Sequence, residues 1–445
     1  MTRFLLVAIA ACFLASSSSW SQTTKPSDTQ RQESTQALSS LQRLKMAAEG
    51  DANQRFQLLK TITPRGASEA DRKEMVSILT GMLDSDYPDI RARAATALEL
   101  FGSEAAPALP TLLKRINDKD TTIELEAVWV PVSKALSSIG PDIALEPLMK
   151  ELATPEAATG PDREKYYGIT AAISGMGTEA KAAAPVFVQL LRNGPENRRW
   201  ATMFTLSKLG DAALPAIPDY IANLDHANFN MQVIACRALA ELGPASAAAA
   251  PKLVELTKNA KMISTRTHAA MCLGAIGPTD NVDVDLEQLF RDMISESNAF
   301  SQERGLIALS RLGTRASQSA SFIEEKLKDD DFSQIPEAAR ALWLITGDNK
   351  RPLEILESVI DDLTYDIRVY PVLHEMGADA EPLKDLLASK LATDDADLQK
   401  TIAETLAKMG TAAKVHLDKI EACLATAPPD VAIALDKAID TIKGS

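Results

Sequence analysis

The sequence predicts an all-α protein, a right-handed α-solenoid of about eleven stacked helix–turn–helix repeats. A glycine, usually preceded by an apolar residue, recurs every 30 to 38 residues between Gly102 and Gly410. Aromatic residues make up only 5% of the 445 positions, too few to anchor the roughly three globular domains that this length would otherwise suggest. Alanine-rich runs such as Ala247–Ala250 favour helices that pack closely through small side chains. Self-similarity at a fixed period indicates one continuous repeat array.

The first helix of each repeat ends at the recurring glycine. Apolar residues 12, 8, 5, 4 and 1 positions before it fall on one stripe of a 3.6-residue helix. The glycine is predicted to end the helix with a positive φ, a conformation that glycine adopts at little cost. The glycines of the series are Gly66, Gly102, Gly140, Gly177, Gly210, Gly243, Gly277, Gly313, Gly347, Gly377 and Gly410. The residues four positions before them, from Gly102 onwards, are Leu98, Leu136, Ile173, Leu206, Leu239, Leu273, Leu309, Trp343, Leu373 and Leu406.

A second helix follows each glycine after a short turn. Proline is tolerated in the first turn of a helix, where its missing N–H has no intrahelical partner. The prolines predicted at this position are Pro110, Pro147, Pro185, Pro218, Pro251 and Pro382. The second helix ends near acidic turns such as Asp118/Asp120 and Asp394/Asp395, which we expect to cap the next first helix.

The N-terminus has the pattern of a secretory signal peptide over residues 1–21. Arg3 precedes a continuous apolar run from Phe4 to Ala15 and a serine-rich stretch, with cleavage predicted after Ser21. The run is too short to span a bilayer, which takes about 20 residues. A second interpretation is a bacterial lipobox, Ile9-Ala10-Ala11-Cys12, in which Cys12 would carry a lipid anchor. Residues 22–36 read as a disordered linker and 37–445 as the solenoid, so a periplasmic or secreted protein of bacterial type is expected.

The repeat resembles HEAT repeats, in particular the short HEAT-like class of phycobilisome lyases. The resemblance covers residues 50–445 and rests on an aliphatic residue before glycine, then alanine or proline, then a leucine-rich helix. Arginines eleven positions before the glycine match a residue that the family often carries near the start of its first helix: Arg55, Arg91, Arg199 and Arg266. The resemblance implies the fold strongly and the function weakly.

No pattern for catalysis or for cofactor binding stands out. The four histidines, His226, His268, His374 and His416, lie at unrelated positions in their repeats, so their side chains are not expected to converge on a metal. HEAT-like deoxyhypusine hydroxylase holds two irons with several His-Glu dipeptides, whereas this chain has only His374-Glu375. The acidic loop Asp280–Asp285 lacks the glycine and the distal glutamate of an EF-hand. It stays open as a cation site, and the prediction is no catalytic residue, metal or cofactor.

The three cysteines that remain after cleavage are expected to be free. Cys236 and Cys272 lie in adjacent repeats, at positions seven and five before the glycine, and should face different directions around their helices. The odd number, counting Cys423, argues against a disulfide framework.

Charge excludes a generally basic nucleic-acid binder. The chain has 47 basic and 61 acidic residues, a formal net charge of -14. Residues 281–445 hold 31 acidic and 18 basic residues, a net of -13, so the acidity belongs to the C-terminal third. This asymmetry favours a protein partner with a basic patch.

The predicted function is that of a non-catalytic extracytoplasmic scaffold or adaptor. Stacked helix pairs curve, and we expect the second helices to line a concave surface that binds another protein. The candidate binding residues are polar positions of those helices: Lys114, Gln189, Asp219, Tyr220, Lys252 and Glu255. The alternative is an accessory lyase or cofactor-handling enzyme, as implied by the similarity to HEAT-like bilin lyases. The oligomeric state is left open.

Overall fold

The computed structural model describes residues 38–123, 126–160, 163–362, 364–425, 427 and 429–444. The predicted signal peptide (1–21), Cys12 and the linker (22–36) lie outside the described residues. From Ser40 onwards the chain forms one compact unit.

The described residues form α-helices and short 3-10 helices without any β-strand, which confirms an all-α solenoid. The first helices of the repeats form one layer: α3 (Ala52–Leu59), α5 (Pro88–Glu99), α7 (Trp129–Ile139), α10 (Glu164–Gly175), α12 (Glu196–Ser207), α14 (Phe229–Glu241), α16 (Ile263–Ile276), α18 (Ala299–Arg311), α20 (Ile335–Thr346), α22 (Asp366–Met376), α24 (Ala396–Lys408) and α26 (Pro429–Gly444). The second helices form the other layer: α2 (Ser40–Glu49), α4 (Glu69–Met82), α6 (Leu109–Arg115), α8 (Pro141–Leu152), α11 (Ala184–Asn193), α13 (Ile217–Asn223), α15 (Ala250–Asn259), α17 (Leu286–Ile294), α19 (Ala320–Lys326), α21 (Lys350–Val359), α23 (Lys384–Lys390) and α25 (Leu417–Leu424).

The glycine register is confirmed at every predicted position. All eleven glycines of the series have positive φ, between 54° and 93°. The column four residues before them forms the inner seam of the core, where the leucines and Ile173 are fully buried. Trp343 is the exception: it is half-buried because its indole Nε1 donates to Asp379 Oδ2 at 3.0 Å. One hydrophobic core runs from Leu44 to Ile442.

The chain takes two routes from the glycine into the second helix. Seven of the glycines open a seven-residue 3-10 helix, such as Gly102–Ala108, before the second helix starts. Four of the six predicted prolines then fall in the first turn of that helix, as Pro110 does in α6. The prediction is wrong for Pro147, because α8 starts directly after Gly140 at Pro141 and leaves Pro147 inside the helix. It is also wrong for Pro382, which lies within the 3-10 helix Gly377–Leu383.

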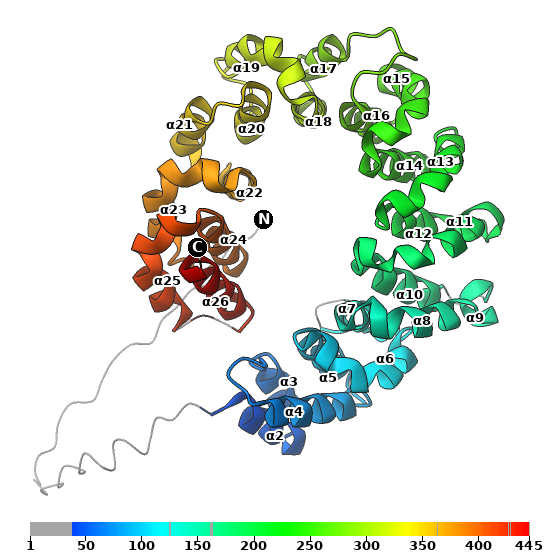
Figure 1. The fold of residues 1–445 in the computed structure, drawn as a ribbon, viewed down its shortest axis with the longest axis vertical. Helices are drawn as coiled ribbons and strands as arrows, with labels where there is room; N and C mark the ends of the chain where they lie inside the picture. Colours follow the sequence, from blue (N-terminus) through cyan, green and yellow to red (C-terminus); the bar gives the residue numbers. More distant parts are fainter. Residues whose placement is uncertain are drawn as a thin grey trace, which may run out of the picture. The chain divides into compact units, whose positions relative to one another are not determined.

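The two layers pack differently, and this fixes the direction in which the row of repeats bends. From α3 to α26, each first helix packs against the next one. Among the described second helices, only α2 and α4 form a comparably packed successive pair. The second helices therefore splay apart and the row bends toward the first helices. Figure 1 shows α12, α14, α16 and α18 on the inner side of the row and α11, α13, α15 and α17 on its outer side. The expectation that the second helices line the concave surface is wrong.

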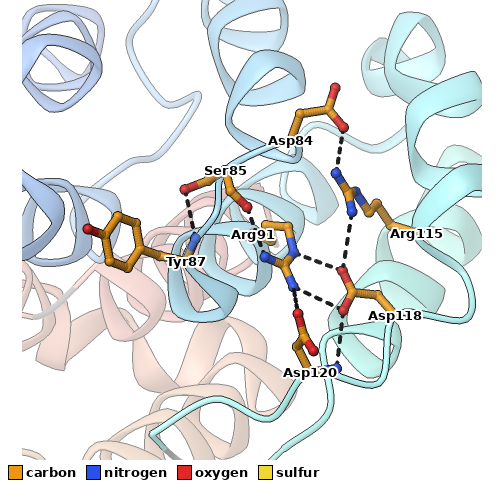
Figure 2. A network of polar contacts seen from close by, with 7 residues as sticks. All are labelled: Asp84, Ser85, Tyr87, Arg91, Arg115, Asp118 and Asp120. Carbon is orange, nitrogen blue, oxygen red and sulfur yellow. Dashed lines mark hydrogen bonds and ion pairs between the residues drawn. The ribbon is translucent and has the colours of Figure 1, made fainter.

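The arginines eleven positions before the glycine link neighbouring helices in three repeats. Arg55 of α3 donates to the carbonyls of Ala48 and Gly50 at the end of α2, at 3.0 and 2.9 Å. Arg91 of α5 is buried and donates to Asp118 at 2.8 and 3.1 Å, to Asp120 at 2.5 Å and to the Ser85 carbonyl at 2.8 Å (Figure 2). Burial alone would lower the pKa of Arg91, but the bonds to the two aspartates outweigh it and raise the pKa. Asp118 and Asp120 thus hold α5 to the turn after α6, and neither acts as the expected helix cap.

Arg266 repeats this arrangement in α16, where it bonds Glu296 after α17 and Ser301 of α18. In α12 the buried arginine is Arg198 and not the predicted Arg199. Arg198 donates to the Ala158 carbonyl at 2.8 Å and the Gly160 carbonyl at 2.9 Å. This fixes the loop that holds the short helix α9 (Pro155–Ala158).

Candidate functional site

An aromatic stack of an exposed ring, Trp200, and a half-buried ring, Phe204, lies on the inner layer along one face of α12. The Trp200 and Phe204 rings are parallel, 2° apart in plane, with centroids 5.6 Å from each other. Trp200 is 47% exposed, although large aromatic side chains normally contribute heavily to cores. Lys208, one helical turn further on, places its ammonium 5.8 Å from the Phe204 centroid and pairs with Glu241 of α14 at 2.8 Å. The stack is therefore linked through Lys208 to the next helix of the inner layer.

A pocket of about 420 Å³ opens beside it, between α14, α16 and α18. Its lining includes Arg237 and Glu241 of α14, His268 of α16, and Arg304 and Arg311 of α18. The arginines eleven positions before the glycine, such as Arg91 and Arg266, do not line this pocket. These side chains come from three consecutive repeats and project from the face of each helix that the core does not use. We call this feature the arginine pocket.

Two of the pocket guanidinium groups are held in place by α16. Arg311 donates from Nη1 to the Met271 carbonyl at 2.8 Å, and Arg304 directs Nη1 to the Met271 sulfur at 3.7 Å. Arg304 also lies 5.0 Å over the Phe300 ring and 3.5 Å from the Glu303 carboxylate. The pocket floor is thus built on contacts between adjacent helices.

Burial and mutual repulsion of cations shape the charges in the pocket. Burial is the main reason that the pKa of His268 is lowered, and the nearby charges of Arg304 and Arg237 lower it further. A hydrogen bond to the Ser264 carbonyl acts in the opposite direction. That bond is 2.7 Å long and takes the Nδ1 proton. Burial likewise lowers the pKa of Arg311, with Arg340 and Arg304 adding to the effect. Burial and the nearby guanidinium groups therefore favour the neutral form of His268 at pH 7.

The thiols under the pocket are not reactive groups. Cys236 and Cys272 are fully buried, and neither they nor Cys423 form a disulfide with a described residue. Burial raises the pKa of Cys236 to about 12 and that of Cys272 well above its usual value. A thiol with a raised pKa carries little of the thiolate that nucleophilic chemistry needs.

The six predicted binding residues are not brought together. Lys114, Gln189 and Glu255 are exposed, but they lie on α6, α11 and α15 of the outer layer. Asp219 of α13 pairs with Arg192 of α11 at 3.0 Å. Lys252 of α15 pairs with Asp225 at 2.5 Å and with Glu255 at 2.9 Å. Asp219 and Lys252 thus form ion pairs along the outer layer, some of them between neighbouring repeats.

Tyr220 is a correction. Its side chain is fully buried, so it cannot contact a partner on the surface of this fold. Its hydroxyl finds no hydrogen-bond partner among the described residues, and burial, followed by the nearby Asp219, raises its pKa. The register places Tyr220 on the apolar stripe of α13, where its ring fills the core.

The sequence did carry a signal for the residues that were missed. Trp200 and Phe204 lie ten and six positions before Gly210, outside the apolar stripe of the first helix. In later repeats, Arg237 occupies the same position as Phe204, six residues before its glycine, and Arg304 and Arg311 lie nine and two residues before Gly313, also outside that stripe. Large or charged side chains at such positions in successive repeats mark a surface that the core does not need.

The described residues contain no group of three or more His, Cys, Asp or Glu side chains that could hold a metal ion. In the acidic loop Asp280–Asp285, Asp285 caps α17 by accepting from the Gln288 N–H at 3.0 Å. His374 is half-buried. A membrane-spanning helix would have to be longer and more apolar than any helix in the described part of the chain.

The comparisons with known proteins point to the fold. No family model and no curated protein matches the sequence. Among solved structures, the chain is similar to Kap121p bound to Pho4p (10% identity over 91% of this chain and 53% of that one, TM-score 0.51). It is also similar to Kap95p from the structure with RanGDP, at 13% identity over 91% of this chain and 62% of that one, with a TM-score of 0.50. The CpcE–CpcF phycocyanin lyase of Nostoc sp. PCC7120 matches at 21% identity over 61% of this chain and 94% of that one, with a TM-score of 0.35.

The chain thus spans between half and two thirds of the length of the two karyopherins. Together with the repeat register and the two packed layers, the structural likeness defines a HEAT-like α-solenoid.

Proposed function

We propose that the protein is a non-catalytic scaffold or adaptor outside the cytoplasm, which binds another protein through the inner layer of its solenoid. The observation that carries the proposal is the Trp200–Phe204 stack, in which Trp200 is exposed, beside the arginine pocket. Tryptophan, tyrosine and arginine dominate the hot spots of protein interfaces. An aromatic stack left open to water gains most when a partner covers it.

Proteins of similar fold lend support. Kap121p is bound to Pho4p in its structure, and Kap95p binds RanGDP. In repeat solenoids, neighbouring repeats create extended concave surfaces of the kind used for binding. The inner layer here has the same construction, with each first helix packed on the next.

Location outside the cytoplasm rests on the N-terminal pattern of Arg3, the apolar run and the serine-rich stretch. Cell fractionation and sequencing of the mature N-terminus test it. The expected result is an envelope or secreted protein that begins at Gln22. A cytoplasmic protein that retains residues 1–21 would contradict it, and a lipid-modified Cys12 would favour the anchored form.

The acidity of residues 281–445 favours a basic patch on the partner where it meets these repeats. The arginine pocket is a local exception within this field. Association that weakens as salt is added from 50 to 500 mM is the expected result, since exposed charges are screened over about 10 Å at 0.1 M.

Affinity capture from the cell-envelope fraction, followed by mass spectrometry, tests the inner face directly. The Trp200→Ala/Phe204→Ala variant is compared with wild type and with Lys114→Ala/Glu255→Ala, which changes only the outer layer. The expected result is a partner that wild type and the outer-layer variant retain and the inner-layer variant loses. Equal capture by all three forms would contradict the proposal.

A further inference from the structure

The arginine pocket holds more positive charge than its own structure neutralises. Three arginines line it, and only Arg304 has a carboxylate partner, Glu303 at 3.5 Å. The one carboxylate in the lining, Glu241, is already paired with Lys208 at 2.8 Å. Arg237 forms no ion pair and no side-chain hydrogen bond with any described residue. This excess occurs in a chain whose net charge is -14.

Hydrogen-bonding capacity is also left over. A guanidinium group offers five N–H donors in a planar fork. Arg311 uses Nη1 on the Met271 carbonyl and forms no ion pair with the described residues. The Nε of Arg304 is buried without a hydrogen-bond partner among them. By contrast, each guanidinium nitrogen of neighbouring Arg340 has a partner, with two bonds of 2.5 and 2.6 Å to Glu375 and one of 2.7 Å to Ser310.

We propose that the arginine pocket binds the carboxylates of an acidic segment in the partner protein, and that an apolar side chain of the same segment covers the Trp200–Phe204 stack. This inference rests on the proposed function and names the chemistry of the partner. Arginine forks match carboxylates in paired, charge-assisted hydrogen bonds. A pocket of about 420 Å³ holds one or two such side chains, not a folded domain.

Continuity with the aromatic stack favours a peptide over a free anion. Lys208 lies over Phe204 and also pairs with Glu241, which lines the pocket, so the two features form one surface. A small anion would fill the pocket and leave Trp200 exposed. A nucleic acid is disfavoured because Glu241 and Glu303 stand beside the arginines and the whole chain repels a polyanion.

The test uses the full chain and two labelled peptides, four glutamates followed by glycine and phenylalanine, and the same peptide with glutamines. Fluorescence anisotropy is expected to show the glutamate peptide binding at least tenfold more tightly than the glutamine peptide. Arg304→Gln and Arg311→Gln should each weaken the glutamate peptide about tenfold. Arg311→Lys should recover only part of the loss, because lysine keeps the charge without the fork. Removing phenylalanine from the peptide should weaken binding to wild type and not to Trp200→Ala/Phe204→Ala.

Arg351→Gln is the matched control, since Arg351 of α21 pairs with Glu324 of α19 in the outer layer. Circular dichroism confirms that each variant is folded. Equal binding of the two peptides, or unchanged binding by the folded Arg304→Gln/Arg311→Gln variant, overturns the inference. Inorganic phosphate that binds as tightly as the glutamate peptide also overturns it, in favour of a small-anion site. If the inner-layer variant still loses the captured partner while no peptide binds, the proposed function stands and only this inference falls.

Discussion

Replacement of Arg91 by alanine is predicted to destabilise the chain by about 3 kcal/mol. The side chains of Arg91 and Asp118 are only 4% and 8% exposed, so the substitution leaves a buried carboxylate without its main partner (Figure 2). Removing one partner of a buried ion pair lowers the free energy of unfolding by about 3–5 kcal/mol. The lower end applies here because Arg115 Nη1 stays 3.8 Å from Asp118 and the Asp120 N–H still donates to it. Asp120 adds little, since its side chain is 64% exposed and water replaces the lost bond.

Arg351→Ala is the control for this prediction. The side chains of Arg351 and its partner Glu324 are 51% and 34% exposed. Exposed ion pairs contribute about 1 kcal/mol or less to the free energy of unfolding. Urea unfolding followed by circular dichroism gives the global effect, and hydrogen exchange over residues 85–120 gives the local one. Arg91→Met/Asp118→Leu should recover most of the loss, because removing both charges leaves no unpaired group in the interior. A cost for Arg91→Ala within 1 kcal/mol of that for Arg351→Ala would refute the reasoning.

Three other predictions concern the cap, the core and the pocket. Gly313→Ala should lower the free energy of unfolding by about 1–2 kcal/mol, because alanine is strained at a φ of 59°. The control Gly81→Ala, inside α4, should raise it by about 0.5–1 kcal/mol. Urea unfolding measures both, and a stabilising Gly313→Ala would contradict the cap assignment. Tyr220→Phe should leave stability unchanged or raise it by up to about 1 kcal/mol, because it removes a buried hydroxyl without a partner among the described residues; a loss above 1 kcal/mol in the same assay would show that the hydroxyl is bonded. The lowered pKa of His268 means that its contribution to stability is present above pH 6.5 and lost as the pH falls below it. A bound carboxylate favours protonated His268, so binding of the glutamate peptide should strengthen between pH 7.5 and 5.5, by at most about tenfold per pH unit. The same slope in His268→Gln would count against this.

The sequence determines the repeat in detail because each unit must bury the same stripe. The eleven glycines, the buried column from Leu98 to Leu406 and the linking arginines Arg91 and Arg266 were all predictable from their spacing. Arg198 does not follow from the spacing, because the carbonyls that it binds, those of Ala158 and Gly160, belong to the irregular segment around α9, which has no counterpart in the other repeats.

Which layer lies inside was not predictable from the periodicity. Both helices of a repeat carry an apolar stripe, and curvature depends on how closely successive helices pack across repeats. The closer packing of one layer decides which side chains line the concave surface, those of the second helices such as Lys114 and Glu255 or those of the first helices such as Trp200 and Arg311. The periodicity therefore places the candidate binding residues on the outer layer, and it does not distinguish Tyr220, whose ring belongs to the core, from the surface positions of α13.

Site-specific photo-crosslinking tests the central claim, that the inner layer of α12–α18 binds the partner, most directly. A photoreactive benzoylphenylalanine is placed at position 204 on α12 or, as the control, at position 186 on α11 of the outer layer, where Val186 is 44% exposed. After irradiation in the native cells, adducts are identified by mass spectrometry. The account predicts one partner protein crosslinked from position 204 and absent from position 186, and lost when Arg304→Gln and Arg311→Gln are added. Crosslinking of the same partner from position 186 but not from position 204 would contradict it.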